Sequence, residues 1–150
     1  MITINKLEFN DLRGLKELYE DAFEGSFTDY DKMILSFNQI NNNPNYIILC
    51  AKSDGKVVGS VMGVICHELF GQCNPFMVIE DVAVLETHRR LGIAKSLMIR
   101  MEEHARQAGC CMIEFVSSEH RKGAHKLYES LGYGVDKVNG YRKRLNDEVF

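Results

Sequence analysis

Hydrophobic and polar positions follow two different periods along the chain, and the changes of period mark the predicted elements. After a short predicted strand over 2–7, apolar residues recur every three or four positions over 12–23 and again over 30–40. This spacing predicts two helices. Asn10 or Asp11 would cap the first helix, and a run of three asparagines and a proline ends the second. The chain is therefore predicted to begin with one strand and two helices.

The middle of the chain changes to the composition of β-strands. The segment 46–69 reads YIILCAKSDGKVVGSVMGVICHEL, two β-rich runs joined through Asp54-Gly55. This turn chemistry is typical of an antiparallel hairpin. The run from Phe76 to Leu85 is a third strand by composition.

The pattern becomes helical again from Leu91. A strand is then predicted over 110–117, a short helix over 122–132 and a final hairpin over 133–145. Gly109 fits the left-handed end of the longer helix. The resulting order β, α, α, β, β, β, α, β, α, β predicts a mixed α+β fold with helices on the faces of the sheet. The apolar stripe of the longer helix consists of Leu91, Ala94, Leu97, Met98, Met101 and Ala105.

Composition fits an ordinary soluble protein and sets limits on function. The 150 residues, 45% hydrophobic and 26% charged, suit a single domain over 1–150. A net charge of −3 argues against general nucleic-acid binding. No apolar run approaches the roughly 18 residues of a membrane span, and Met1 does not open a secretory signal. We therefore expect a cytoplasmic protein that contacts neither membrane nor nucleic acid.

The number and spacing of the cysteines indicate neither disulfide bonds nor a metal site. The five cysteines are an odd number, include the adjacent pair Cys110-Cys111 and contain no C-x-x-C spacing. We expect buried, reduced thiols in a cytosolic protein, and no metal site.

The turn before the longer helix carries candidate chemistry. The segment over 87–94 reads THRRLGIA and places two arginines and a glycine at a helix start. The first turn of a helix has unpaired amides and attracts phosphate, and arginine adds forked donors. Two arginines at this positive end are unfavourable unless an anion offsets them. A solvated basic surface is the alternative; the phosphate motifs G-x-x-x-x-G-K-[ST] and G-x-G-x-x-G are both absent.

The same residues resemble the signature of the GNAT N-acetyltransferases. Their motif [QR]-x-x-G-x-[GA] is matched by Arg89, Gly92 and Ala94, after a strand that ends in Val-Ala-Val. A second family pattern, a helix with Ala-x-x-x-Tyr that closes in Gly-aromatic, is matched over 124–133 by AHKLYESLGY. The resemblance covers residues 45–145. It implies the GNAT fold, a mostly antiparallel twisted sheet of six to seven strands flanked by about four helices.

The resemblance also implies a cosubstrate and the residues that hold it. GNAT enzymes use acetyl-coenzyme A, whose pyrophosphate would lie on the amides of the helix start. Its pantetheine arm would pair with the backbone of Val82 and Val84. Tyr128 matches the tyrosine that protonates the departing thiolate, and Arg121 stands where many relatives carry asparagine. The full set expected at the cosubstrate is Val82, Ala83, Val84, Arg89, Arg90, Leu91, Gly92, Ile93, Ala94 and Lys95.

A second group must deprotonate the amine that receives the acetyl group. An alkyl amine is protonated at neutral pH, so a carboxylate usually serves as the base, directly or through water. Glu80 and Asp81 lie in the strand before the arginines. In an unbroken strand Glu80 would share a face with Val82 and Val84, although a bulge would change this. We expect Glu80 to be the base and Asp81 to bind the ammonium group or support Glu80.

The acceptor is expected to be the primary amine of a small molecule. Several stretches look closest to small-molecule enzymes such as the aminoalkylphosphonate acetyltransferases. The loops over 24–31 and 66–76 would build the acceptor pocket, where Asp29, Asp31 and Glu68 would favour a cation. Two alternatives stay open: a peptide or protein N-acetyltransferase, and a catalytically silent coenzyme A sensor. Similar proteins are commonly dimers, so a homodimer is also open.

Overall fold

The computed structural model describes residues 1–118 and 121–147 of the chain. These residues belong to two compact units, one of Met1–Glu114 and one that starts at Phe115. The first unit contains all five strands and three α-helices, and the second contains helix α4 (Lys122–Ser130).

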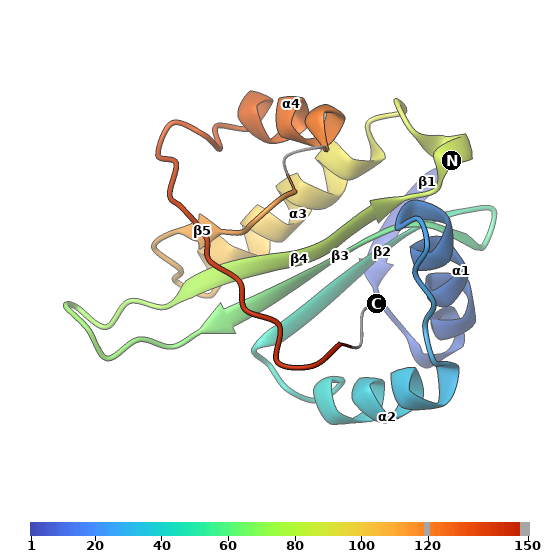
Figure 1. Ribbon diagram of the computed structural model, residues 1–150, viewed down its shortest axis with the longest axis horizontal. Helices are drawn as coiled ribbons and strands as arrows, with labels where there is room; N and C mark the ends of the chain where they lie inside the picture. Colours follow the sequence, from blue (N-terminus) through green and yellow to red (C-terminus); the bar gives the residue numbers. More distant parts are fainter. Residues whose placement is uncertain (119–120, 148–150) are drawn as a thin grey trace. The chain divides into compact units, whose positions relative to one another are not determined.

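The first unit is built on one five-stranded sheet with the order β1-β2-β3-β4-β5 (Figure 1). All neighbouring strands are antiparallel except β4 and β5, which are parallel. The mixed α+β class and the mostly antiparallel sheet predicted from the sequence are confirmed. The strands are β1 (Ile2–Lys6), β2 (Tyr46–Ser53), β3 (Lys56–Cys66), β4 (Phe76–Val84) and β5 (Ile113–Glu114). The helices of this unit are α1 (Leu12–Ala22), α2 (Tyr30–Ile40) and α3 (Ile93–Gln107), with short 3-10 turns η1 (Phe9–Asp11) and η2 (Glu86–His88).

Helices α1 and α3 cover opposite faces of the sheet. Successive side chains of a strand point to opposite faces. In β3, Gly59 faces α3, where an added Cβ would lie 2.9 Å from Ile93. The register with β2 has an extra β3 residue between Val57 and Gly59, so Val57 faces the other way, and a Cβ added at Gly14 of α1 would lie 2.9 Å from it. Figure 1 shows the two helices on either side of the strands. The unit therefore has three layers, and the two faces of β3 and β4 meet different helices.

The predicted hairpin between β2 and β3 is confirmed, including its turn. Asp54 and Gly55 have positive φ angles of 49° and 79°, as a two-residue type I′ turn requires. The tight turn aligns Ser53 with Lys56 and brings the long, largely buried strand β3 to the centre of the sheet.

Glycines in β3 let α3 approach the sheet closely, and this gives a stability prediction. An added Cβ at Gly59 would lie 3.2 Å from Leu97 Cδ1 and 3.3 Å from the carbonyl oxygen of Ala83, in addition to its contact with Ile93. Backbone cannot move aside as a flexible side chain can, so Gly59→Ala is expected to cost about 1–3 kcal/mol. A denaturant titration measures the loss. The control Gly123→Ala has open space within 4 Å in a helix and should not destabilise; an unchanged midpoint for Gly59→Ala would contradict the packing described.

Helix α3 begins two residues later than the apolar stripe predicts. Leu91 is 65% exposed, so its assignment to the buried stripe is wrong. Arg90 and Gly92 have left-handed φ angles of 64° and 79°, which interrupt the helical backbone on both sides of Leu91. The rest of the stripe is confirmed, with Leu97, Met98, Met101 and Ala105 buried.

The number of strands is smaller than predicted. The described residues contain five strands rather than six to seven, the strand over 110–117 is reduced to β5, and no strand is assigned in 133–147. The apolar residues of the predicted hairpin are exposed: Val135 at 93%, Val138 at 73% and Tyr141 at 95%. An isolated two-stranded hairpin is marginally stable without a face to bury, which explains why turn chemistry alone does not produce one.

All five cysteines are free. Cys50 is buried in β2, and this burial raises the pKa of its thiol to about 12, so that it behaves as a small apolar residue. The expectation of buried thiols is wrong for Cys73 and Cys111, which are exposed.

Candidate active site

A β-bulge in β4 reorients the strand at the two predicted carboxylates. Met62 of β3 lies opposite Glu80, and Ser60 lies opposite Ala83, so β4 carries one extra residue in this interval. Asp81 takes up that residue with a left-handed φ of 55°. A bulge with this backbone re-aims the side chains that follow it.

The bulge overturns the expectation that Glu80 shares a face with Val84. Residues directly opposite each other in an antiparallel pair point to the same face. Glu80 therefore lies on the face of Met62 and Ser60, which is the face of α1, whereas Val84 lies with Gly59 on the α3 face. The extra residue reverses the alternation of side chains along β4. Glu80 therefore faces the layer of α1, and Val84 faces the layer of α3.

Asp81 differs from an ordinary exposed carboxylate in its surroundings. Asp81 is near enough to Tyr19 of α1 for its charge to affect the tyrosine. As a residue Asp81 is exposed, but neighbouring protein atoms desolvate its carboxyl group, and this burial raises the pKa of Asp81. Glu80, also exposed, is the preceding residue of the strand. A carboxylate with a raised pKa next to a second acid is suited to binding and deprotonating an amine.

The edge of β4 opposite β3 is open beyond its first residues. In the described chain, β5 pairs with β4 only at Met77 and Val78. The amide of Leu85 donates to Val58 of β3, so the backbone groups of the preceding residue, Val84, point to the open edge. Arg89 Nε donates to the Val84 carbonyl oxygen at 3.3 Å. A pantetheine arm that used this carbonyl would first have to displace Arg89.

The start of α3 has the backbone geometry of the turn for which anion binding was predicted. Gly92 precedes the helix with a φ of 79°, no side chain caps the first turn, and that turn contains no acidic residue. The first intrahelical bond links Ser96 N to Gly92 O, so the amides of 93–95 have no acceptor within the helix. An added Cβ at Gly92 meets nothing within 4 Å, which shows that the backbone angle, rather than crowding by protein, requires glycine here.

A hydrogen bond ties this turn to α1. Asp21 Oδ2 accepts from the amide of Glu86 at 2.9 Å, although the two residues are 65 positions apart. Nothing in the sequence pattern distinguishes Asp21 from other surface acids of the first helix. The contact places the end of α1 beside the segment that leads from β4 to Arg89 and Gly92.

Tyr128 lies in the second unit, within an aromatic cluster. Its ring packs edge-to-face on Phe115 at a centroid distance of 4.6 Å, and the ring of Tyr133 is 6.4 Å away. The amide of Tyr133 donates to the Tyr128 carbonyl at 3.0 Å after the positive φ of Gly132. Burial raises the pKa of the Tyr128 phenol, and the positive charge of Arg121 partly opposes this. Tyr128 is therefore protonated at neutral pH, as a proton donor must be.

The residues predicted to line the acceptor pocket have structural partners. Asp29 caps α2 by accepting from Lys32 N at 3.1 Å, and Asp31 lies in the first turn of that helix. Glu68 Oε1 accepts from the amides of Leu69 and Phe70. His67 Nε2 lies 3.1 Å from Asn45 Oδ1. Asp29 and Glu68 thus stabilise their own loops.

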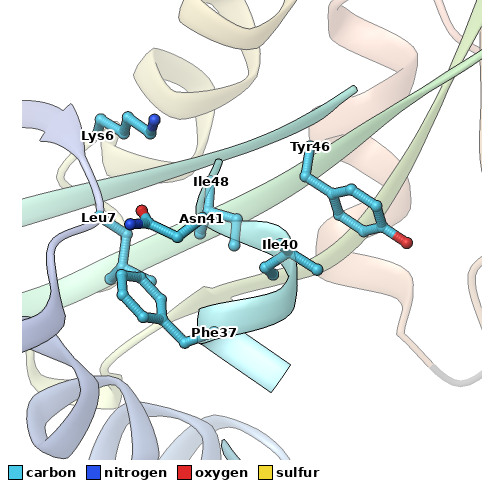
Figure 2. Close-up of a pocket in the computed structure, with 7 residues that line it drawn as sticks. All are labelled: Lys6, Leu7, Phe37, Ile40, Asn41, Tyr46 and Ile48. Carbon is cyan, nitrogen blue, oxygen red and sulfur yellow. The ribbon is translucent and has the colours of Figure 1, made fainter. Parts of the chain in front are cut away.

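A shallow, mostly apolar pocket lies elsewhere in the first unit, between α2 and the strands β1 and β2 (Figure 2). It contains none of the predicted site residues and no carboxylate. Figure 2 shows its lining residues: Lys6, Leu7, Phe37, Ile40, Asn41, Tyr46 and Ile48. The open edge and the bulge of β4, rather than this pocket, hold the groups that could carry chemistry.

Two further searches cover the described residues only. Within 1–118 and 121–147, no three histidine, cysteine or acidic side chains are arranged to hold a metal ion. In the same residues, no helix has the length and apolar character needed to cross a bilayer.

Known proteins resemble this chain in sequence and in fold. The family model of the acetyltransferase (GNAT) family matches residues 12–133. Aminoglycoside N(6')-acetyltransferase type 1 of Salmonella typhimurium is 28% identical over 97 residues, 63% of this chain and 67% of its own.

Solved structures support the same fold at lower identity. A transcriptional regulator from Bacillus halodurans superposes with a TM-score of 0.87 at 21% identity, over 96% of this chain and all of its own. Aminoglycoside N-acetyltransferase AAC(6')-Iy, bound to a coenzyme A bisubstrate analogue, superposes with a TM-score of 0.78 at 22% identity, over 96% of this chain and 99% of its own. The family model spans most of the chain, which therefore belongs to the GNAT family of acetyltransferases, enzymes that use acetyl-coenzyme A as the resemblance implied.

Proposed function

We propose that this chain is an acetyl-coenzyme A-dependent N-acetyltransferase that moves an acetyl group to the primary amine of a small molecule by direct transfer in a ternary complex. The observation that carries the proposal is the β4 bulge, which lies at Glu80 and Asp81 in a strand that leads into the glycine turn at the start of α3, where we propose that the anion binds. The aminoglycoside N-acetyltransferase among the relatives supports an amine acceptor.

The residues of the first unit fit a nucleotide cosubstrate. Free amides at the start of α3 and the exposed guanidinium groups of Arg89 and Arg90 suit a pyrophosphate, and the open edge of β4 suits an extended arm that pairs like a strand. Acetyl-coenzyme A supplies the acetyl group as a thioester. We assign its binding to Val82, Ala83 and Val84 and to the run Arg89, Arg90, Leu91, Gly92, Ile93, Ala94 and Lys95.

The proposed proton transfers need three side chains. Asp81 binds the ammonium group, and Glu80 takes one of its protons, so that the nitrogen lone pair can attack the acetyl carbonyl. The carbon–nitrogen bond forms and the carbon–sulfur bond breaks. A backbone amide near Val82 stabilises the oxyanion, Tyr128 gives its proton to the departing thiolate, and the second proton that the nitrogen loses returns the phenol to its neutral form. The role of Tyr128 depends on the family resemblance, with its burial and raised pKa in support.

Asp81→Asn tests whether Asp81 binds the amine and whether its buried charge lowers the free energy of unfolding. Because the pKa of Asp81 is raised in the folded protein, the ionised carboxylate destabilises the fold once the pH rises through that pKa. Asparagine tolerates the left-handed φ. We expect the variant to be more stable than the wild type at pH 7, by less than about 1 kcal/mol because solvent screens the group, and equally stable near pH 3. Its KM for the amine should rise about tenfold.

Urea titrations at the two pH values measure this difference. Asp54→Asn is a control, because Asp54 has the same left-handed backbone in the β2–β3 turn, away from the bulge. An unchanged KM in Asp81→Asn would contradict the assignment of Asp81 to the acceptor site. A lower stability of this variant at pH 7 would contradict the conclusion that burial of the ionised carboxylate destabilises the fold.

The overall proposal is tested by binding and turnover together. Acetyl-coenzyme A should raise the melting temperature, since a ligand that binds only the folded state stabilises it. A panel of aminoglycosides, polyamines, simple alkylamines and peptides is then assayed by release of free thiol. Stabilisation without turnover on any amine or peptide would indicate a coenzyme A sensor. Turnover on peptides alone would indicate a peptide N-acetyltransferase, and no stabilisation would end the proposal.

Cellular context completes the proposal. Five free cysteines, two of them exposed, fit a reducing cytoplasm. The net charge of −3 gives no attraction to nucleic acid. The partner we propose is the small-molecule amine. A single N-acetyltransferase domain over 1–150 stays a prediction, and so does a homodimer.

A further inference from the structure

We propose that Ser117 and His125 position Tyr128, the side chain that gives its proton to the departing thiolate in the proposed reaction. The inference rests on the proposed N-acetyltransferase activity and deepens it. Ser117 lies outside the Ala-x-x-x-Tyr pattern of α4, and His125 occupies one of its variable positions. All three residues belong to the second unit.

A hydrogen bond between two side chains ties α4 to the segment that follows β5. His125 Nε2 lies 3.2 Å from Ser117 Oγ, in a partly buried position. His125 lies within α4, whereas Ser117 precedes this helix by several residues. The bond therefore links the helix that carries Tyr128 to a separate part of the chain.

The aromatic cluster makes a second link between the same two segments. Phe115 packs edge-to-face on Tyr128, with ring centroids 4.6 Å apart. Phe115 and Ser117 are two positions apart, which is about 6–7 Å in an extended chain. His125 and Tyr128 are three positions apart, which is about 5–6 Å on one side of a helix. The two spacings match, so the hydrogen bond and the ring contact form side by side.

The residue between the two links faces another part of the second unit. A Cβ added at Gly140 would lie 2.8 Å from Val116 Cγ1. The contacts of Phe115, Val116 and Ser117 thus alternate, as side chains do in an extended segment. This segment is held by α4 on one side and by the chain at Gly140 on the other, and it forms a fixed support for the helix.

The hydrogen bond supplies a constraint that ring packing lacks. Helix α4 has only nine residues, so its position depends on packing rather than on its own stability. Edge-to-face ring pairs form over a range of centroid distances from about 4.5 to 7 Å. A hydrogen bond weakens steeply away from its preferred angle and distance. The bond of His125 therefore limits rotation of α4 about its axis, and with it the direction of the Tyr128 phenol.

The bond does not require one charge state of His125. A neutral imidazole has one donor and one acceptor nitrogen, an imidazolium has two donors, and a serine hydroxyl both donates and accepts. Nε2 can therefore keep its bond to Ser117 in either state. The side-chain amide nitrogen of glutamine reaches about the same place and can donate to the hydroxyl oxygen. His125→Gln should thus keep the position of the helix but lose the ability to exchange a proton.

The test measures kcat and KM for an amine that the wild type acetylates, using full-length variants. We expect His125→Ala and Ser117→Ala each to lower kcat about tenfold, because a misplaced reacting group loses much of its effect. The KM for the amine should change little, since the phenol acts only as the thiolate departs. His125→Gln should keep the wild-type kcat. Lys126→Ala, an exposed position of the same helix, is the matched control and should also keep it.

The same substitution in a Tyr128→Phe background separates positioning from other roles. A residue that acts through the phenol has nothing to position once the hydroxyl is gone, so His125→Ala should then change kcat by less than about twofold. A further tenfold loss in this background overturns the inference. An equal loss in His125→Gln and His125→Ala also overturns it, because the imidazole would then take part in proton transfer itself.

Melting temperatures show which variants are folded. If His125→Ala does not fold, Ser117→Ala, which removes a single hydroxyl, replaces it in both backgrounds. A folded Ser117→Ala variant with the wild-type kcat overturns the inference. Full turnover in Tyr128→Phe alone overturns both the role of Tyr128 and the inference, whereas a wild type that acetylates no amine contradicts the proposed function.

Discussion

Tyr128→Phe is expected to lower kcat by about 10²- to 10⁴-fold, the usual contribution of a positioned proton donor. The phenol is protonated because burial raises its pKa, and phenylalanine keeps the edge-to-face packing on Phe115 while it removes the proton. Binding of acetyl-coenzyme A should change little, because the departing thiolate exists only late in the reaction. Steady-state kinetics with saturating donor measures kcat, and a thermal shift with acetyl-coenzyme A measures binding.

Tyr141→Phe is the matched control for this variant. Tyr141 lies in the same unit but is 95% exposed, so the loss of its hydroxyl should leave kcat unchanged. Should Tyr128→Phe retain full turnover across the whole pH range, the thiolate must receive its proton from water or another group. A uniform loss of donor binding would instead show that Tyr128 acts in packing.

Glu80→Gln is expected to lower the rate by about 10²-fold at neutral pH and by progressively less as the pH rises. The reason is the state of the acceptor, since an alkyl amine with a pKa near 10 needs a base at neutral pH and little help once it is already deprotonated. The profile of kcat/KM against pH should therefore become steeper on its acidic side. The measurement uses one amine from pH 6 to 10.

Glu103→Gln provides the comparison for Glu80. Glu103 lies on α3, with its carboxylate 3.7 Å from Arg100 Nε. Because it lies outside the proposed site, its replacement by glutamine should leave the pH profile unchanged. If the profile of Glu80→Gln equals that of the wild type, the base is a water molecule or Asp81. The double variant with Asp81→Asn distinguishes these two, because only a role for Asp81 predicts a further change in the acidic limb.

Local sequence chemistry predicts the turns of this protein well. Asp54-Gly55 predicts the hairpin turn and Gly109 predicts the left-handed end of α3, where its φ angle is 77°, because positive φ angles are cheap for only a few residue types. The buried stripe of α3 follows from its spacing. The prediction fails at Leu91, where the same spacing continues through a backbone that is not helical.

The acceptor side of the site depends on contacts that no local pattern contains. The extra residue in β4 is visible only in the register with β3, and it reverses the face of every side chain that follows. The hydrogen bond between Asp21 and the amide of Glu86 joins residues 65 positions apart, so no local pattern predicts it.

The hydrogen bond between Asp21 and the amide of Glu86 connects the end of helix α1 with the turn that leads to Gly92. If an amine that binds next to α1 makes this helix more rigid, the turn before α3 should become more rigid as well. Thermodynamic linkage then requires that each substrate changes the affinity for the other by an equal amount. The two substrates should therefore alter each other's affinity by the same factor, and replacing Asp21 should make their binding independent.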